Sequence, residues 1–425
     1  MSIIELGEVH GDDASMAPAP RPPRAVGRPA RSVAVLLLAA VVLAGAAPVP
    51  GRMVSPVPAA RAAAAYLAED GVFVVDPPTA TGDRYLTAYA PPTADGGVRR
   101  RWQAPLPRTG DYLGVRVERG LVLVLGISAA NGVFQTTAFA AETGRQRWQH
   151  YGRSQPTADG GPLLIDDTTD EPAVLSRVEP DTGRVLWSVP IPPPSNAAYQ
   201  VHDGRVDRFV LVQPTGEVQV HDAGSGDLLR SVDTLPGDRS AFQRVQVVDD
   251  LLLLVPPGGT RLLGYGLPDL SPRWAADVPL VSYVIGCAGL LCALQQTGGL
   301  QVLDPASGAV RWSDPGLDTL TDVRRGRMLV AGPNQRYAAR DAATGQARAE
   351  LGQWNLVPTL RPDDPLVGVR PVRDGRLVVA ELDLVAGRSR IIDVLPDVVG
   401  NCQASLPILL CQRLDGSTAL WRLPE

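Results

Sequence analysis

The sequence lacks several residues and motifs that define common functional classes. It has no lysine, so all 40 basic residues are arginine, and 45 acidic residues give a formal net charge of -5. No summed positive field therefore exists to hold a nucleic-acid backbone. The four histidines, which have no metal-ligand spacing, are His10, His150, His202 and His221. Neither a Gly-x-Ser-x-Gly elbow nor a glycine-rich phosphate loop is present, so the sequence gives no sign of a serine hydrolase or a nucleotide-binding loop.

Charged residues make up only 20% of the chain, whereas hydrophobic residues make up 45%, which is enough for a large core. The 43 glycines and 40 prolines predict many turns. At 425 residues the chain could hold two or three ordinary domains, but all-β propellers exceed the usual domain size as one unit. The composition favours short strands joined by tight loops.

The N-terminal region predicts export from the cytoplasm. Residues 1–31 are polar and rich in proline and arginine, and we expect a disordered cytoplasmic tail. Residues 32–51 carry no charge, and a helix through them would rise about 30 Å, the thickness of a bilayer core. More arginines lie before this segment than soon after it, which places the N-terminus in the cytoplasm and the rest of the chain outside.

Two interpretations of residues 32–51 remain open. One is a single-pass transmembrane anchor formed by an apolar helix, and the other is a signal segment cleaved near Ala46, because Ala44-Gly45-Ala46 fits the small-x-small pattern. No cysteine precedes Cys287, which excludes a lipid-modified N-terminal cysteine. Residues 52–65, rich in proline and alanine, are interpreted as a spacer before a folded region at residues 66–425.

A repeat of about 41 residues runs through this folded region. Its clearest copies begin Glu179-Pro-Asp-Thr-Gly, Asp304-Pro-Ala-Ser-Gly and Asp341-Ala-Ala-Thr-Gly. The glycine of this motif recurs at Gly144, Gly183, Gly226, Gly308, Gly345 and Gly387. Degenerate copies lie at residues 268–274 and 95–102.

The motif predicts the corner of a hairpin, where an acidic side chain caps the turn and glycine takes a positive φ. Two short β-rich runs precede each corner, one strand follows it, and the period leaves room for one more strand. Each repeat is therefore predicted to form a four-stranded blade. The fold class is an all-β propeller of about eight blades, with seven as the alternative, preceded by the N-terminal apolar helix.

The repeat resembles that of the pyrroloquinoline-quinone-like (PQQ-like) propellers, which carry D-x-x-[ST]-G-x-x-x-W with the tryptophan docked on the neighbouring blade. The resemblance implies that the docking residues are Trp102, Trp148, Trp187, Trp274 and Trp312. Arg230, Ala349 and Ile391 depart from the pattern, and Trp354 lies off it and should matter less for stability. Residues 398–423 have no corner, so we expect them to complete one blade together with an incomplete N-terminal unit.

Four cysteines occur late in the chain, and three pairings are possible. The segments that contain Cys292 and Cys411 align at the same position of a blade, which favours two equivalent local disulfides, Cys287–Cys292 and Cys402–Cys411. Their spacing and the absence of nearby histidines argue against zinc. Export of the chain is consistent with disulfides.

The resemblance raises the hypothesis of an enzyme, since some members of the family are quinone-dependent dehydrogenases. Those members have an adjacent-cysteine disulfide over the cofactor and a calcium ion, whereas this chain has no Cys-Cys pair. Its acidic residues lie mostly at corners, where capping explains them. The acidic group Asp166, Asp167, Asp170 and Glu171 could bind a divalent cation, but we interpret it as a solvated loop. We therefore expect no catalytic residue, cofactor or metal.

The leading hypothesis is a non-catalytic platform outside the cytoplasm that binds protein partners or a ligand in the cell envelope. It rests on analogy with the propeller lipoprotein that scaffolds outer-membrane protein assembly. A reduced quinoprotein dehydrogenase and an extracellular sensor domain are the alternatives. The sequence does not identify the partner, since fold alone does not define function.

Overall fold

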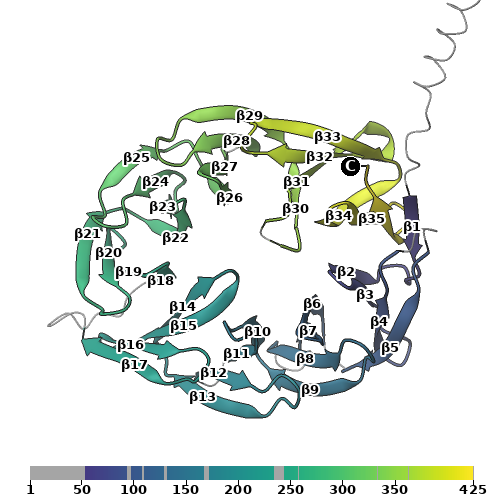
Figure 1. The fold of residues 1–425 in the computed structure, drawn as a ribbon, viewed down its shortest axis with the longest axis horizontal. Coiled ribbons are helices and arrows are strands. Elements are labelled where there is room, and N and C mark those ends of the chain that lie inside the picture. Colours follow the sequence, from purple (N-terminus) through teal and green to yellow (C-terminus); the bar gives the residue numbers. More distant parts are fainter. Residues whose placement is uncertain are drawn as a thin grey trace, which may run out of the picture. The chain divides into compact units, whose positions relative to one another are not determined.

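A computed structural model describes residues 53–92, 97–107, 110–128, 132–166, 172–233, 244–256, 258–332, 334–361 and 363–424. These residues belong to one compact unit, Arg52–Glu425, that contains nine four-stranded antiparallel sheets. The sheets surround a common axis as the blades of a β-propeller (Figure 1). The predicted cytoplasmic tail, apolar helix and cleavage site lie outside the described residues. Among the residues that are described, no helix has the length and apolar content needed to cross a membrane.

Blades 1 to 3 are formed by β2 (Ala64–Ala68), β3 (Gly71–Val75), β4 (Arg84–Tyr89) and β5 (Arg100–Leu106); β6 (Tyr112–Glu118), β7 (Leu121–Ile127), β8 (Phe134–Ala140) and β9 (Gln146–Tyr151); and β10 (Arg153–Pro156), β11 (Pro162–Asp166), β12 (Ala173–Val178) and β13 (Val185–Ile191). Blades 4 to 6 are formed by β14 (Asn196–His202), β15 (Arg205–Val212), β16 (Glu217–Asp222) and β17 (Leu228–Asp233); β18 (Arg244–Val248), β19 (Leu251–Val255), β20 (Arg261–Gly266) and β21 (Pro272–Asp277); and β22 (Val281–Cys287), β23 (Leu290–Gln295), β24 (Leu300–Leu303) and β25 (Val310–Asp314).

Blades 7 to 9 are formed by β26 (Thr319–Arg324), β27 (Arg327–Ala331), β28 (Arg336–Asp341) and β29 (Ala347–Gln353); β30 (Asn355–Val357), β31 (Val367–Val372), β32 (Arg376–Asp383) and β33 (Arg388–Leu395); and β34 (Val398–Ser405), β35 (Ile408–Arg413) and β36 (Thr418–Arg422) with β1 (Met53–Val57). A short 3₁₀ turn, η1 (Arg373–Gly375), links β31 to β32.

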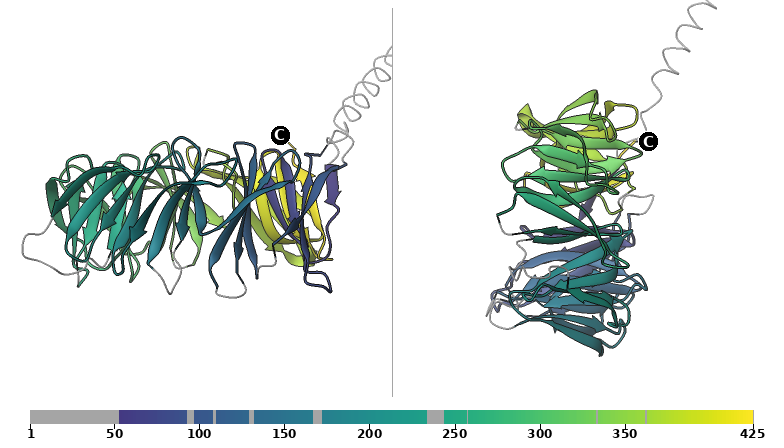
Figure 2. Two further views of the ribbon diagram at one scale, coloured as in Figure 1. Left: turned by 90° about the horizontal axis from the view of Figure 1, so that it is seen from below. Right: turned by 90° about the vertical axis from the view of Figure 1, so that its left-hand side faces the viewer.

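Within each blade the strands run as a meander, from an innermost first strand to an outermost fourth strand (Figure 1). The turn between strands one and two and the corner between strands three and four consequently lie on one side of the ring, which we call the corner face. The loops between strands two and three and the links between blades lie on the other side, the linker face. Figure 2 shows the strands running between these two faces.

The hydrophobic core is divided among the junctions between blades. In the described part of the chain there are nine clusters of buried apolar residues, and each joins two neighbouring blades. At the first junction, Phe73 and Trp102 of blade 1 meet Phe139 of blade 2. Because each blade buries both of its faces against its neighbours, the ring must close to leave no apolar face exposed.

The ring closes through a ninth blade, so the expected count of eight is wrong. Strands β34, β35 and β36 take their outermost partner, β1, from the start of the described chain, with Val54 opposite Trp421. Ser55 and Val57 of β1 are buried, whereas the alternate residues Val54 and Pro56 are exposed, as in any half-buried strand. This confirms that residues 398–423 complete a blade with an N-terminal segment, but the segment is β1 rather than a part of the first repeat. Blade 9 has no corner, so a count of corners leaves it out.

This arrangement also corrects the predicted spacer at residues 52–65. Strand β1 and the first residues of β2 lie inside that range, so the propeller begins before Tyr66. The first unit is not incomplete, because β2 to β5 form a full blade of their own.

The inner side of the closure is held by blade 8 and blade 9 together. Residues 358–361 follow β30 and pair with β34 through Thr359 and Ala404, an extra contact on the inner edge of blade 9. Arg361 Nε then donates to Glu69 Oε1 of blade 1 at 2.6 Å. The Gln403 amide accepts from Leu67 N and donates to Ala65 O, both at 2.8 Å, so blade 9 is also bonded to β2.

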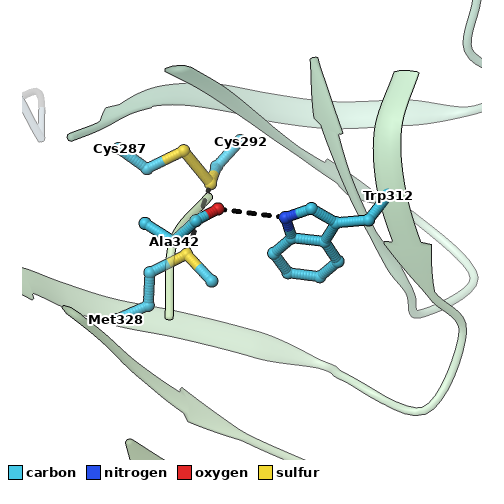
Figure 3. Close-up of a disulfide and its surroundings, with 5 residues drawn as sticks. All are labelled: Cys287, Cys292, Trp312, Met328 and Ala342. Carbon is cyan, nitrogen blue, oxygen red and sulfur yellow. Dashed lines mark hydrogen bonds between the residues drawn. A yellow bond between two sulfur atoms is a disulfide. The ribbon is translucent and has the colours of Figure 1, made fainter. Parts of the chain in front are cut away.

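Two disulfides join the first and second strands of their blades. Cys287 and Cys292 are bonded in blade 6, and Cys402 and Cys411 are bonded in blade 9, so the structure contains both predicted pairs. Figure 3 shows the first of these beside blade 7, where Cys292 Sγ lies 3.6 Å from Met328 Sδ. Both bonds lie in the apolar core.

Candidate functional site

The five tryptophans of the repeat each lie on the fourth strand of a blade and reach the corner of the next blade. Their indole Nε1 atoms donate to corner carbonyls at 2.7 to 3.0 Å, as Trp102 does to Ala141 O and Trp312 does to Ala342 O (Figure 3). The rings of Trp102 and Trp148 are buried, while those of Trp187, Trp274 and Trp312 are half-buried. These contacts explain the tryptophans as parts of the blade junctions.

Two of the junctions without a docking tryptophan differ at the corner. Blade 4 carries the exposed Arg230 at the tryptophan position, and the facing corner of blade 5 carries Leu270, at φ 54°, where other corners have glycine. Leu270 is buried there, since no indole occupies its space. Ile391 of blade 8 is 59% exposed because blade 9 has no corner for it to contact.

Trp354 lies off the repeat motif but is buried at a junction between blades. It forms the single-residue link between β29 and β30, is only 6% exposed, and donates from Nε1 to Leu351 O at 2.7 Å. It is part of the cluster that joins blades 7 and 8, where Ala349 replaces the docking tryptophan. A second tryptophan position therefore serves this junction.

The acidic residues of the corners cap their own turns. Asp222 Oδ1 accepts from Gly224 N and Ser225 N, and Asp304 Oδ1 accepts from Ala306 N and Ser307 N, all at 2.8 to 3.1 Å. Asp341 and Asp383 make equivalent bonds. Of the acidic group predicted near Asp166, the residues 167–171 lie outside the described residues.

A second sequence signal lies in the turns between the first and second strands of the blades. Four of the nine turns between the first and second strands place an Asp, Arg or Ala and then a glycine in the left-handed region, and the pairs are Arg119-Gly120, Asp203-Gly204, Ala288-Gly289 and Arg325-Gly326. Two successive positive φ values define the type I′ hairpin turn. Each such pair precedes an apolar strand, so a search for Asp-Gly or Arg-Gly before an apolar run could have found these turns.

A polar hollow lies on the corner face. It has a volume of about 440 Å³ and lies where blades 3, 4 and 5 meet. Its lining carries four carboxylates, and the charged or amide side chains are Asp159, Gln200, His202, Asp207, Arg208, Asp222 and Asp250. The turn of blade 3, the first two strands and the corner of blade 4, and the turn of blade 5 each contribute to it.

Internal bonds hold several of these side chains in place. Arg177, whose side chain is 4% exposed, donates to Asp159 Oδ2 at 2.8 Å. Gln200 Nε2 donates to Asp249 O at 3.0 Å and to Asp250 Oδ1 at 3.1 Å. His202 Nδ1 is hydrogen-bonded to Asp207. Bonds within the chain therefore hold these side chains of the lining in place without a bound partner.

The local charges affect the titration of the lining. The hydrogen bond to Asp207 raises the pKa of His202 above its ordinary value, and the charges of Asp250 and Asp249 raise it further. Burial raises the pKa of Asp159, but hydrogen bonds from Thr157 and Arg177 outweigh it and lower that pKa overall. The lining has four carboxylates against Arg208 and His202, and Arg177 neutralises one of the four, so a small excess of negative charge remains and favours a positively charged group.

No catalytic residue was expected, and the hollow was not among the predicted sites. None of the predicted docking or disulfide residues lines it. Within the described ranges, no group of three or more His, Cys, Asp or Glu side chains is arranged to hold a metal ion.

Nine four-stranded blades around one axis define the chain as a β-propeller. No protein family and no curated protein matches the sequence. Among solved structures, BamB from Moraxella catarrhalis is 14% identical with a TM-score of 0.40, and the match covers 87% of this chain and 97% of that one. Sqt1 from Saccharomyces cerevisiae is 11% identical with a TM-score of 0.46, covering 77% and 93%. The computationally designed protein Ika8 is 15% identical with a TM-score of 0.47, covering 73% and 96%.

Proposed function

We propose that this chain is a non-catalytic propeller of the PQQ-like type that acts outside the cytoplasm and binds a basic segment of a protein partner. The observation that carries the proposal is the acidic hollow of the corner face, where Asp159, Asp207, Asp222 and Asp250 converge from three blades. Residues 32–51 attach the propeller to the membrane as an anchor, or direct its secretion and are removed near Ala46. The two disulfides agree with an oxidising compartment.

The chemistry of the hollow suits a guanidinium or ammonium group. Carboxylate oxygens accept charge-assisted hydrogen bonds, which are about twice as strong as neutral ones. Because Asp250 is already bonded to Gln200, and Asp159 to Arg177, little side-chain freedom is lost when a partner binds. A ring of this size also offers a broad surface around the hollow for further contacts.

The same lining favours binding over covalent catalysis. His202 and Asp207 have the arrangement of a base and its orienting carboxylate. However, none of the described residues that line the hollow carries a hydroxyl or thiol that such a base could activate. The corner aspartates, in turn, are used as caps of their own turns.

A defined peptide tests the proposal. The probe is a dodecapeptide with four arginines, compared with the same peptide in which citrulline replaces arginine, since citrulline keeps the shape and removes the charge. We expect the purified full chain to bind the arginine peptide at least tenfold more tightly. Asp250→Asn should remove most of this preference, whereas Asp70→Asn, at the turn of blade 1 on the same face, should retain it. Equal binding of the two peptides, or equal effects of the two substitutions, would refute the proposal.

Two further measurements address partner and compartment. A photo-crosslinking amino acid at Ala158, on the rim of the hollow, should capture a partner in intact cells, and the crosslink should be mapped to a basic segment of that partner. N-terminal sequencing of the native protein decides between an anchor and cleavage near Ala46. With added quinone and calcium, the purified protein should oxidise neither alcohols nor sugars; a saturable activity abolished by one carboxylate substitution would support an enzyme instead.

A further inference from the structure

A second polar pocket lies on the opposite side of the ring, at the junction of blades 7 and 8. Its volume is about 420 Å³, and the residues that matter for its chemistry are Gln335, Gln353, Trp354, Asn355, Arg370 and Pro371. Gln335 comes from the loop between β27 and β28, Trp354 from the link between blades, and Arg370 from the end of β31. These positions place the pocket on the linker face, away from the acidic hollow.

Arg370 is the only charged residue among those described that line the pocket. Its guanidinium lies over Trp354, with Cζ 4.7 Å from the ring centroid, and Trp354 is itself buried. Within the described part of the chain, Arg370 forms no ion pair, so its donors remain available to a ligand. The stacked tryptophan holds this cation in position and leaves its charge uncompensated.

Three amide side chains line the pocket together with Arg370. Gln353 is exposed, and its Nε2 donates to Asn334 O at 2.9 Å, so its Oε1 is left as an acceptor. Gln335 and Asn355 are exposed at the rim. An amide supplies both donors and acceptors, and a hydroxyl needs both, so this set suits a ligand with several hydroxyl groups. The ring of Pro371 adds apolar surface.

We propose that this pocket binds an acidic sugar. The carboxylate of a uronate would form paired hydrogen bonds with Arg370, and the amides of Gln335, Gln353 and Asn355 would bind its hydroxyls. A phosphate group could also pair with an arginine, so the test must separate the two oxyanions. This inference does not depend on the acidic hollow or on its partner.

The experiment measures binding of glucuronate, glucose and glucose 6-phosphate to the purified full chain by ligand-observed NMR. Glucuronate should bind at least tenfold more tightly than glucose. Arg370→Gln should remove this preference, whereas Arg376→Gln, which removes an exposed arginine from the start of β32 on the same face, should keep it. Asn355→Ala should weaken the binding of glucuronate and of glucose alike, at least threefold. If Arg370→Gln lowers the melting temperature, the Asn355→Ala variant provides the test instead.

Each other outcome overturns the proposal. Equal affinity for glucuronate and glucose would show that the pocket does not recognise the carboxylate. Tighter binding of glucose 6-phosphate than of glucuronate would assign the pocket to phosphate instead. A preference for glucuronate that survives Arg370→Gln, or an Asn355→Ala variant with unchanged binding, would place the sugar elsewhere on the molecule.

Discussion

The indole of Trp102 lies directly against the backbone of Gly144 on the next blade. A β-carbon built on Gly144 would be 2.4 Å from Trp102 Cε3, closer than real atoms approach. The same relationship links Trp148 to Gly183 and Trp312 to Gly345. Where a corner receives a docked tryptophan, glycine is therefore required for two reasons: its φ is positive, and the indole of the preceding blade occupies the space of a side chain.

These two requirements can be separated by substitution. Gly345→Ala would place Cβ 2.7 Å from Trp312 Cδ2, at φ 72°, whereas Gly204→Ala, at φ 73°, meets no atom within 4 Å. Gly204→Ala should cost about 1 kcal/mol of unfolding free energy from backbone strain alone. Gly345→Ala should cost about 2 to 4 kcal/mol, since overpacking is added to the strain. Urea unfolding of both variants gives the comparison, and equal losses would show that contact with Trp312 is unimportant.

The sequence predicted these junctions because they depend on local chemistry. Gly183 and Trp187 lie four residues apart, so the corner and the strand after it are visible in one short motif. The corner that contains Leu270 matches the repeat motif only weakly. No tryptophan docks on this corner, so its fifth position can hold a side chain instead of glycine. The closing blade was expected from residues 398–423, which have no corner, but the sequence did not show that its last strand, β1, precedes a complete first blade, so the count was one too low. The acidic hollow could not be predicted from the sequence either, because Asp159 and Asp250 come to line the same hollow only when blades 3, 4 and 5 are assembled.

Trp354→Ala should destabilise the protein at least as much as Trp312→Ala, which contradicts the expectation from the repeat. Trp354 is 6% exposed and Trp312 is half-buried, and truncation of a core aromatic residue costs about 3 to 5 kcal/mol. Chemical unfolding monitored by circular dichroism measures both losses. A clearly smaller loss for Trp354→Ala would mean that Ala349 and its neighbours hold blades 7 and 8 together without it.

Peptide mapping without reductant should find Cys287 linked to Cys292 and Cys402 linked to Cys411. Each bond closes a short loop, and the chain-entropy argument gives about 2 kcal/mol of stabilisation apiece. Replacing Cys287 and Cys292 together with alanine should lower the unfolding free energy by roughly this amount, and the same double replacement at Cys402 and Cys411 is the matched comparison. Free thiols, or a link between Cys292 and Cys411, would contradict the assignment of equivalent positions in blades 6 and 9.

Stability should fall in acid partly through Asp341. A hydrogen bond from Arg348, with others from Thr344 and Arg327, lowers the pKa of Asp341 from 3.8 to about 2. A carboxyl whose folded pKa is depressed stabilises the protein above its unfolded pKa, and this contribution is lost as the pH falls towards the folded pKa. Asp341→Asn should therefore be less stable than the unsubstituted protein at pH 7, and the difference should narrow as the pH falls below about 4. Urea midpoints across this range measure it; a difference that stays constant would show that the charge of Asp341 is not involved.

Removal of β1 should open the ring. A chain that begins at Met53 keeps β1, the strand that pairs with β36. A chain that begins at Pro58 lacks β1 and leaves β36, which contains the buried Trp421, with an unpaired backbone edge. Loss of the buried Val57 side chain alone should cost about 1.5 to 3 kcal/mol, and the exposed edge should promote self-association. Light scattering after size exclusion should show a monomer for the longer chain and larger species for the shorter one. A synthetic peptide of residues 50–60 should restore the monomer by supplying the missing strand. If the shorter chain instead stays monomeric with an unchanged melting temperature, closure rests on the inner contacts of Gln403 and Arg361 rather than on β1.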